Sequence, residues 1–258
     1  MRTPELFRLD GKLALVTGGS RGLGLQMAEA LGEMGARVVL VARSQEALAE
    51  ARDRLTSQGI ETDCVAADLT RVEAIPDLVA NVLDRHQRID VLVNNAGKSW
   101  GARAEDQPLD TWRMILEINL TAPFMLAREV GRQAMIPARS GKIINVASVA
   151  GLRGTPPGIM RALPYNASKA GLINLTRTLA AEWAAYGINV NALAPGFFLT
   201  RLTRAVVAQA EDVIVAHTPL GRLGGDDDLK GAVVFLASAA SAYVTGAVLS
   251  VDGGMSAI

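Results

Sequence analysis

The chain has 258 residues, half of them apolar and a fifth charged, a balance typical of a protein with one large core or two small ones. Lysine plus arginine and aspartate plus glutamate number 26 each, so no excess charge favours nucleic acid or an anionic membrane. One cysteine excludes an intrachain disulfide, and two histidines cannot form a metal site by themselves. The sequence shows neither a signal-peptide core nor an uncharged apolar run of membrane-spanning length, so the expected location is the cytoplasm.

Short apolar runs alternate with longer segments of helical character along the whole chain. The predicted strands are 13–18, 37–43, 62–69, 89–97, 141–148, 188–196 and 247–254, and the predicted helices are 22–35, 44–59, 71–86, 109–135, 163–180 and 226–238. This alternation favours parallel strands joined by right-handed crossovers. The strands are apolar almost throughout, as expected when helices cover both faces. We therefore expect a single α/β domain spanning residues 1–258, with a doubly wound, seven-stranded parallel sheet.

The first predicted strand ends in the glycine-rich stretch TGGSRGLG, in which Gly18, Gly22 and Gly24 follow a G-x3-G-x-G spacing. Glycines allow the backbone to turn tightly and approach a diphosphate, whose charge is stabilised at a helix N-terminus. The spacing differs from the general G-x-G-x-x-G fingerprint, and an ordinary glycine turn would look similar. Its place between the first strand and the first long helix favours dinucleotide binding.

The end of the second predicted strand indicates which dinucleotide is bound. A site selective for NAD usually has an acidic residue here for the ribose 2′-hydroxyl, whereas this chain has Ala42 followed by Arg43. Arg21, in the glycine turn, can reach the same region. Two guanidinium groups without a carboxylate suit a 2′-phosphate, so the predicted cofactor is NADP(H).

Polar residues also follow the later strands. Asp68 ends the third, Asn94 and Asn95 end the fourth, and Ser148 ends the fifth. In an open α/β sheet, ligands bind beyond the carboxyl ends of the strands, so these groups are expected to converge at one edge. The two asparagines fit equally well as structural ties between strands or as part of the cleft.

Tyr165 lies four residues before Lys169, near the start of a predicted helix. This spacing places a phenol and an ammonium on one helical face. Two explanations fit the pair: polar residues of a solvated face, or a proton donor with the cation that tunes it.

Taken in order, the motifs resemble those of the short-chain dehydrogenase/reductase family from about Leu13 to Gly254. They are TGGSRGLG, NNAG, Asn119 in EINLT, Ser148 in NVASVAG, YNASK and APGFFLT. The resemblance implies a Rossmann fold and an enzyme that interconverts a ketone and a secondary alcohol with NADP(H).

The resemblance also implies roles for individual residues. Tyr165 would be the general acid/base and Lys169 would lower its pKa while binding the nicotinamide ribose. Ser148 would donate a hydrogen bond to the substrate oxygen, and Asn119 would hold a water in a locally opened helix. The implied cofactor-binding residues are Gly18, Ser20, Arg21, Leu23, Arg43, Asp68, Leu69, Asn95, Gly97, Tyr165, Lys169, Phe198 and Thr200.

Two segments are expected to shape the substrate site. The interval from Ser148 to Tyr165 is longer than in most family members, with the apparent insertion in GTPPGIMRA. This segment is expected to influence substrate choice through Met160 and Arg161. Residues 197–219 are expected to form a lid, as in the family. Trp100 fits a buried core position or a substrate-facing one equally well.

The leading substrate hypothesis is a 3-oxoacyl thioester, and the alternative is a polyol or sugar acid such as gluconate. Cations expected at the cleft rim suit an anionic carrier arm or a carboxylate: Lys98, Arg103, Arg153, Arg161 and Arg204. A less favoured hypothesis is a non-catalytic NADP-binding scaffold. The resemblance further implies a homotetramer with segments 109–135 and 163–185 at its interface. An apolar row at Leu172, Leu175, Leu179 and Trp183 fits that interface or packing against the sheet.

Overall fold

The computed structural model describes residues 2–156 and 159–258, so Pro157 and Gly158 of the predicted insertion lie outside the described residues. Its strands form one parallel sheet in the order β3-β2-β1-β4-β5-β6-β7. Their bounds are β1 Leu13–Thr17, β2 Arg37–Ala42, β3 Thr62–Ala66, β4 Val91–Asn94, β5 Gly141–Val146, β6 Ile188–Pro195 and β7 Val248–Val251. The predicted doubly wound, seven-stranded parallel sheet is confirmed.

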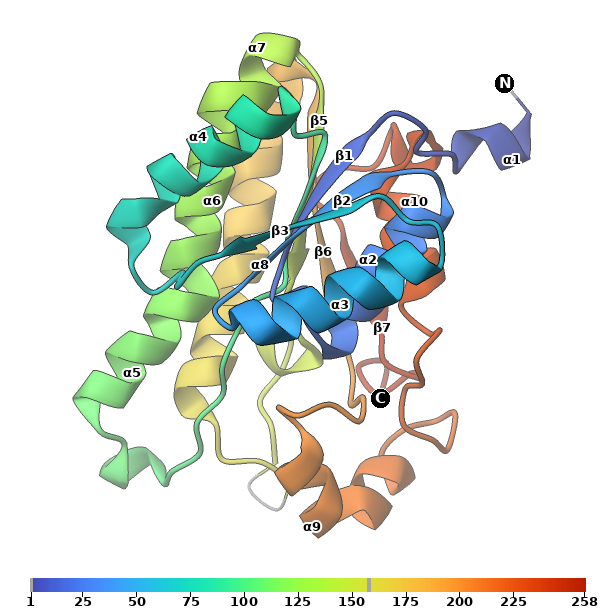
Figure 1. Ribbon diagram of the computed structural model, residues 1–258. Helices are drawn as coiled ribbons and strands as arrows, with labels where there is room; N and C mark the ends of the chain where they lie inside the picture. The colour runs from blue at the N-terminus through green and yellow to red at the C-terminus, as the bar shows by residue number, and fades with distance from the viewer. Residues whose placement is uncertain (1, 157–158) are drawn as a thin grey trace.

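Helices cover both faces of this sheet. Figure 1 shows α2, α3 and α10 on one side, and α4, α6 and α8 on the other. The helices are α1 Thr3–Leu6, α2 Gly22–Glu33, α3 Gln45–Ser57, α4 Ile75–His86, α5 Leu109–Leu116, α6 Ala122–Val130, α7 Ile136–Ala138, α8 Leu163–Trp183, α9 Arg204–Ala216 and α10 Lys230–Ala237. No described helix has the length and apolar character needed to cross a membrane.

The two faces of the sheet explain why its strands are apolar almost throughout. In β1, Ala14 and Val16 pack in the cluster that includes residues of α2, α3 and α10. Leu13 and Leu15 point to the other face and pack with residues of α4, α6 and α8. Because successive strand residues face opposite ways, a strand covered on both sides must be apolar at every position.

The helix predicted at 109–135 is not a continuous α-helix. π-Helical turns at Glu117–Thr121 and Gly131–Met135 flank α6. The first turn contains Asn119, so the expected local opening of the helix is confirmed. The prediction of a helix from Asp226 was early by a turn, since α10 begins at Lys230. Asp228 instead accepts a hydrogen bond from the Gly225 amide and pairs with Arg222, which holds the preceding residues in a turn.

The apolar row on α8 belongs to the core rather than to an exposed surface. Leu172 and Leu179 are at most 5% exposed. Leu175 and Trp183 pack against the same cluster that contains Leu179. Trp183 also fills the space beside Gly131, where an added Cβ would lie 2.8 Å from its ring. Packing inside the chain therefore explains these four positions, and they carry no evidence for an interface.

The order of strands reverses between β1 and β4, which pair with each other at the middle of the sheet. Connections from β1 run toward β2 and β3, and those from β4 run toward β5, β6 and β7. The loops beyond these carboxyl ends diverge and leave a crevice between them. The glycine-rich turn after β1 and the NNAG segment after β4 lie at this crevice.

Candidate active site

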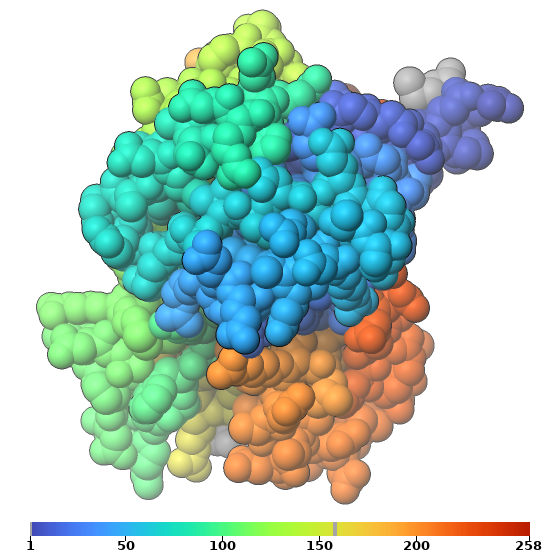
Figure 2. Space-filling model, in the orientation of Figure 1, coloured from blue at the N-terminus to red at the C-terminus, as the bar shows by residue number. Residues whose placement is uncertain are grey.

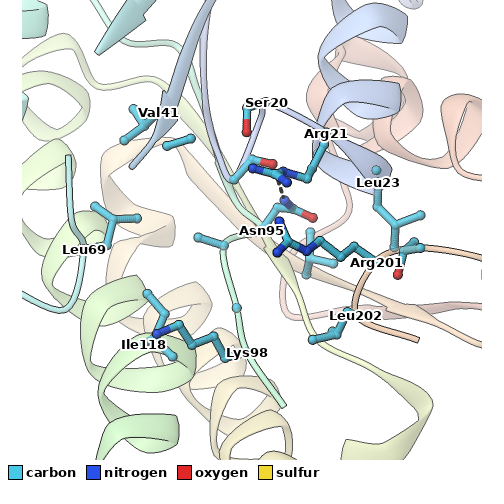
Figure 3. Close-up of a pocket in the computed structure, with 18 of the residues that line it drawn as sticks. Ser20, Arg21, Leu23, Val41, Leu69, Asn95, Lys98, Ile118, Arg201 and Leu202 are labelled. Carbon is cyan, nitrogen blue, oxygen red and sulfur yellow. Dashed lines mark hydrogen bonds between the residues drawn. The ribbon is translucent and has the colours of Figure 1, made fainter. Parts of the chain in front are cut away.

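A cleft of about 810 Å³ occupies the crevice beyond β1 and β4. Its wall includes every residue implied for cofactor binding: Gly18, Ser20, Arg21, Leu23, Arg43, Asp68, Leu69, Asn95, Gly97, Tyr165, Lys169, Phe198 and Thr200. Figure 3 shows labelled side chains that line this pocket. In Figure 2 the orange surface of segment 197–219 forms the lower centre and right of the visible face. Residues far apart in the sequence are thus gathered around one cavity.

The glycine turn requires small residues because NNAG lies directly against it. A Cβ added to Gly18 would lie 2.8 Å from Asn95 Nδ2, and one added to Gly24 would lie 2.3 Å from the Gly18 carbonyl oxygen. Gly18 also has φ of +64°, which favours glycine. The side-chain amide of Asn95 donates through Nδ2 to the carbonyls of Thr17 and Gly18, at 2.9 and 3.3 Å. Asn95 therefore both ties the turn to β4 and lines the cleft.

Gly24→Ala is expected to lower the free energy of unfolding by about 1–3 kcal/mol, because its Cβ would overlap the Gly18 carbonyl. The matched control is Gly231→Ala in α10, where an added Cβ has no described neighbour within 4 Å. That change should be neutral or slightly stabilising, because alanine favours a helix over glycine. Urea denaturation of both variants measures the difference. Equal stability of the two would show that the glycine turn tolerates a side chain.

The hydrogen bonds of Asn94 favour the structural alternative, a tie between strands. Its Nδ2 donates to Asn145 Oδ1 at 2.9 Å, and Asn145 Nδ2 donates to Thr176 Oγ1 at 2.9 Å. This buried chain links β4, β5 and α8. Thr17 has a similar role that the sequence analysis missed: its hydroxyl accepts from the Asn95 and Ala96 amides at 2.9 and 3.1 Å. The position of Thr17 just before the first glycine of the turn is the sequence feature that could have indicated this role.

The charges around the cleft suit an anionic ligand. Arg21 and Arg43 line the cleft, and neither forms an ion pair with a carboxylate of the described residues. The first amides of α2 add the partial positive charge of a helix N-terminus. Asp68 is the acidic side chain of the wall, and hydrogen bonds from the Thr70 amide and hydroxyl hold its pKa below the ordinary value. It remains an acceptor at neutral pH.

Tyr165 and Lys169 stand one helical turn apart at the start of α8. The Lys169 Nζ lies 5.6 Å from the centre of the Tyr165 ring and donates to the Val146 carbonyl at 2.7 Å. Lys169 is only 4% exposed. Ser148 follows β5, and its Oγ accepts from the Ala150 amide at 3.1 Å. Strand β5 and helix α8 thus bring the three polar groups to one wall of the cleft.

Burial is the main cause of the pKa shifts of Tyr165 and Lys169. It raises the pKa of Tyr165, and a hydrogen bond with Ser148 works in the opposite direction. Burial also lowers the pKa of Lys169 to about 8. The direction is upward because removal of the phenolate from water outweighs the hydrogen bond. The lowering by Lys169 and a bound nicotinamide that the resemblance implies stays a prediction.

Asn119 lies behind the cleft, in the π-helical turn. Its Oδ1 accepts from the Lys98 amide at 2.9 Å, and its Nδ2 donates to the Lys98 carbonyl and Ser168 Oγ at 2.9 and 3.0 Å. These bonds tie the loop after β4 to α8. A Cβ on Gly97 would lie 3.0 Å from Asn119 Oδ1 and 3.7 Å from Lys169 Nζ. The asparagine therefore stands close to the lysine across Gly97.

A second pocket opens on the other side of Ser148 and Tyr165. Its wall is largely apolar and includes Val149, Ile159, Met160, Phe197, Leu202, Val206 and Met255. Arg153 is the cation of this wall, and its guanidinium donates to the Ile258 carbonyl at 2.7 Å. Ser148 and Tyr165 thus stand between the larger cleft and this apolar pocket.

The structure places two of the five cations expected at the cleft rim in the walls of these pockets. Of the five expected cations, Lys98 lines the larger cleft and Arg153 the apolar pocket. The other three line neither of these pockets, and Arg103 pairs with Glu105 at 2.6 Å. Trp100 is 49% exposed, which excludes a core position. A cleft residue that the sequence analysis missed is Arg201, next to Thr200.

Comparison with known proteins agrees with this site. The family described as enoyl-(acyl carrier protein) reductase matches residues 18–256, and the chain belongs to the short-chain dehydrogenase/reductase family. It is 41% identical to gluconate 5-dehydrogenase of Gluconobacter oxydans, over 99% of this chain and 98% of that protein. It is 38% identical to the rhamnolipid-biosynthesis 3-oxoacyl-[acyl-carrier-protein] reductase of Pseudomonas aeruginosa, over 96% and 97%.

Solved structures resemble the chain over its whole length. A gluconate 5-dehydrogenase from Burkholderia cenocepacia, solved in complex with NADP and tartrate, has a TM-score of 0.94 and 39% identity, with all of both chains covered. The Pseudomonas aeruginosa RhlG/NADP active-site complex has a TM-score of 0.91 and 37% identity, covering 99% of this chain and all of that chain. Relatives with different named substrates thus share this architecture.

Proposed function

We propose that the protein is an NADP(H)-dependent oxidoreductase that interconverts a ketone and a secondary alcohol. The observation that carries the proposal is that Tyr165 and Ser148 line both a dinucleotide-sized cleft and a second, apolar pocket, while Lys169 lines the cleft beside them. A carbonyl group in the second pocket would lie beside groups able to exchange a proton and to bind its oxygen. The shared NADP in related structures supports the choice of cofactor.

The residues of the larger cleft fit NADP(H). Gly18 and Gly24 allow close approach to the diphosphate, Arg43 and Arg21 are left for the 2′-phosphate, and Asp68 offers an acceptor to the adenine amine. Phe198 and Thr200 lie toward the nicotinamide end of the proposed site. When bound, the nicotinamide supplies or accepts the hydride.

The side chains of the chain itself would handle the proton. Tyr165 would donate its phenolic proton to the substrate oxygen during reduction and take it back during oxidation. Ser148 would donate a hydrogen bond to that oxygen as negative charge develops there. Lys169 would stabilise the phenolate and bind the nicotinamide ribose, and Asn119 would hold a water that links Lys169 to solvent.

For the substrate, the apolar wall of the second pocket favours the 3-oxoacyl hypothesis. Met160, Ile159 and Val206 offer contacts to an acyl chain. The alternative is a polyol or sugar acid, supported by the identity to gluconate 5-dehydrogenase. Arg153 would then bind the carboxylate after exchanging its bond to the Ile258 carbonyl.

A panel of ketones tests these hypotheses through NADPH oxidation followed by absorbance. It should include a 3-oxoacyl thioester, 5-ketogluconate and a simple aliphatic ketone. Turnover of the thioester with the highest kcat/KM supports the leading hypothesis, and preference for 5-ketogluconate supports the alternative. Tight NADPH binding without turnover of any member would favour a non-catalytic scaffold.

Arg43→Ala is expected to lower the affinity for NADPH by roughly ten- to hundredfold, because a charge-assisted hydrogen bond contributes about 1.5–3 kcal/mol. The affinity for NADH, which lacks the 2′-phosphate, should change little. Fluorescence titration of both nucleotides measures the effect. Arg52→Ala, on the exposed side of α3, is the matched control. Equal losses for NADPH and NADH would contradict the assignment of Arg43.

We also retain the homotetramer, the lid and the cytoplasmic location as proposals. Support for an interface over 109–135 and 163–185 now comes from the exposed apolar residues Leu109, Met114, Phe124 and Leu163, which are 37–59% exposed. Support for a lid comes from Phe197, Phe198 and Leu202, because segment 197–219 lines both pockets. Light scattering that reports a 27.2 kDa monomer would exclude the tetramer.

A further inference from the structure

Arg201 is a cation of the larger cleft that has no role in the function proposed above. It lies at the start of the proposed lid and lines the larger cleft. Figure 3 shows its side chain extending into the part of the pocket where Arg21 and Asn95 are also drawn. Its neighbour Thr200 lies across the start of α2, since a Cβ on Gly22 would be 3.8 Å from Thr200 Cγ2. Arg201 therefore stands near the helix N-terminus that faces the cleft.

The charge of Arg201 is available to a ligand. Within residues 2–156 and 159–258, it forms no ion pair with a carboxylate, whereas Arg222, beyond α9, is paired with Asp228 at 2.6 Å. The backbone that carries Arg201 is held in place. The Thr200 amide donates to Thr203 Oγ1 at 3.0 Å, and the Thr203 hydroxyl donates in turn to the Phe198 carbonyl. A fixed backbone thus presents a cation to the cleft.

We propose that Arg201 binds the diphosphate of the dinucleotide. The inference rests on the proposed function. It assigns the diphosphate rather than the 2′-phosphate because Thr200 lies against the first residue of α2, where the helix N-terminus favours a diphosphate. Arg43 follows β2 and is left for the 2′-phosphate. The two arginines would then bind different parts of one cofactor.

The test compares ligands that contain one or both phosphate groups. Arg201→Ala should weaken NADPH and NADH by the same factor, roughly tenfold or more, since both carry the diphosphate. It should leave 2′-AMP, which has no diphosphate, unchanged. Arg43→Ala should instead weaken binding of NADPH and 2′-AMP and leave binding of NADH nearly unchanged. Arg201→Lys should recover part of the loss. Arg204→Ala, an exposed arginine three residues further on that lines neither pocket described above, is the matched control and should bind all three ligands like wild type.

Fluorescence titration gives Kd for the two dinucleotides, and competition against NADPH gives Kd for 2′-AMP. Thermal unfolding of each variant checks that the fold is retained. An unchanged Kd for both dinucleotides in Arg201→Ala, with a wild type that binds them, would overturn this inference alone. A loss restricted to NADPH and 2′-AMP would also overturn it and assign Arg201 to the 2′-phosphate. A wild type that binds no dinucleotide would overturn the proposed function and this inference together.

Discussion

Tyr165→Phe is expected to lower kcat by roughly 10²–10⁴-fold, the usual contribution of general acid–base assistance. The change removes one hydroxyl and keeps the ring that lines both pockets. Packing and cofactor affinity should therefore stay close to those of wild type. The phenol is otherwise a poor proton donor or acceptor near neutrality, and burial raises its pKa further. A cationic neighbour and the positive ring of an oxidised nicotinamide would favour the phenolate during turnover.

Single-turnover kinetics with saturating NADPH measures this effect on the chemical step, and fluorescence titration measures cofactor affinity separately. Tyr186→Phe is the matched control, because Tyr186 is a partly exposed tyrosine beyond the end of α8. It should retain full activity. If kcat of Tyr165→Phe stayed within a few-fold of wild type, Tyr165 would not be the proton donor.

The second large effect concerns stability and pH. Burial lowers the pKa of Lys169 from 10.5 to about 8, which corresponds to about 3 kcal/mol of destabilisation while the lysine is charged. At pH 7 the folded and unfolded states both hold the proton, and the folded state carries this cost. Between about pH 8 and 10.5 the folded state loses the proton first, so the unfolded state binds more protons and stability rises with pH.

Without added cofactor, wild type should therefore gain stability relative to Lys169→Met between pH 7 and pH 9.5. Lys142 is half-buried, with its pKa also lowered by burial to about 8, and it contributes a similar slope to both proteins. The difference between the two proteins isolates Lys169. Urea denaturation at several pH values measures it. Parallel pH profiles for wild type and Lys169→Met would mean that the pKa of Lys169 in the folded protein stays near its ordinary value.

Much of this architecture follows from local patterns in the sequence. Apolar runs such as Leu13–Thr17 predicted strands because a sheet covered on both faces requires apolar residues at every position. The glycine turn was predictable because only glycine permits the approach of Asn95. The sequence could not show which apolar residues of α8 face the sheet, since Leu172 and Trp183 suit a core or an interface equally well.

The polar residues were harder to interpret for a related reason. Residue type shows that Asn94 and Asn95 can form hydrogen bonds but not which partners they have. Partners such as Asn145 lie far away in the chain and are brought close only by the order of strands. The direction of the Tyr165 pKa depends on burial, which the four-residue spacing to Lys169 does not report. Arg201 was missed although its neighbour Thr200 was predicted to bind the cofactor, because the sequence does not show which way the Arg201 side chain points.

The π-helical turn at Glu117–Thr121 limits how this enzyme can be altered. Such a turn usually holds one residue more than an α-helical turn, and each residue advances a helix by about 100°. The extra residue lets Asn119 point inward while Leu126 and Val130 also face the core, all at most 1% exposed. Deleting one residue to regularise the helix would set its two halves out of phase. Either the asparagine or the core leucine and valine would rotate away, so the irregularity allows one helix to serve both the site and the core.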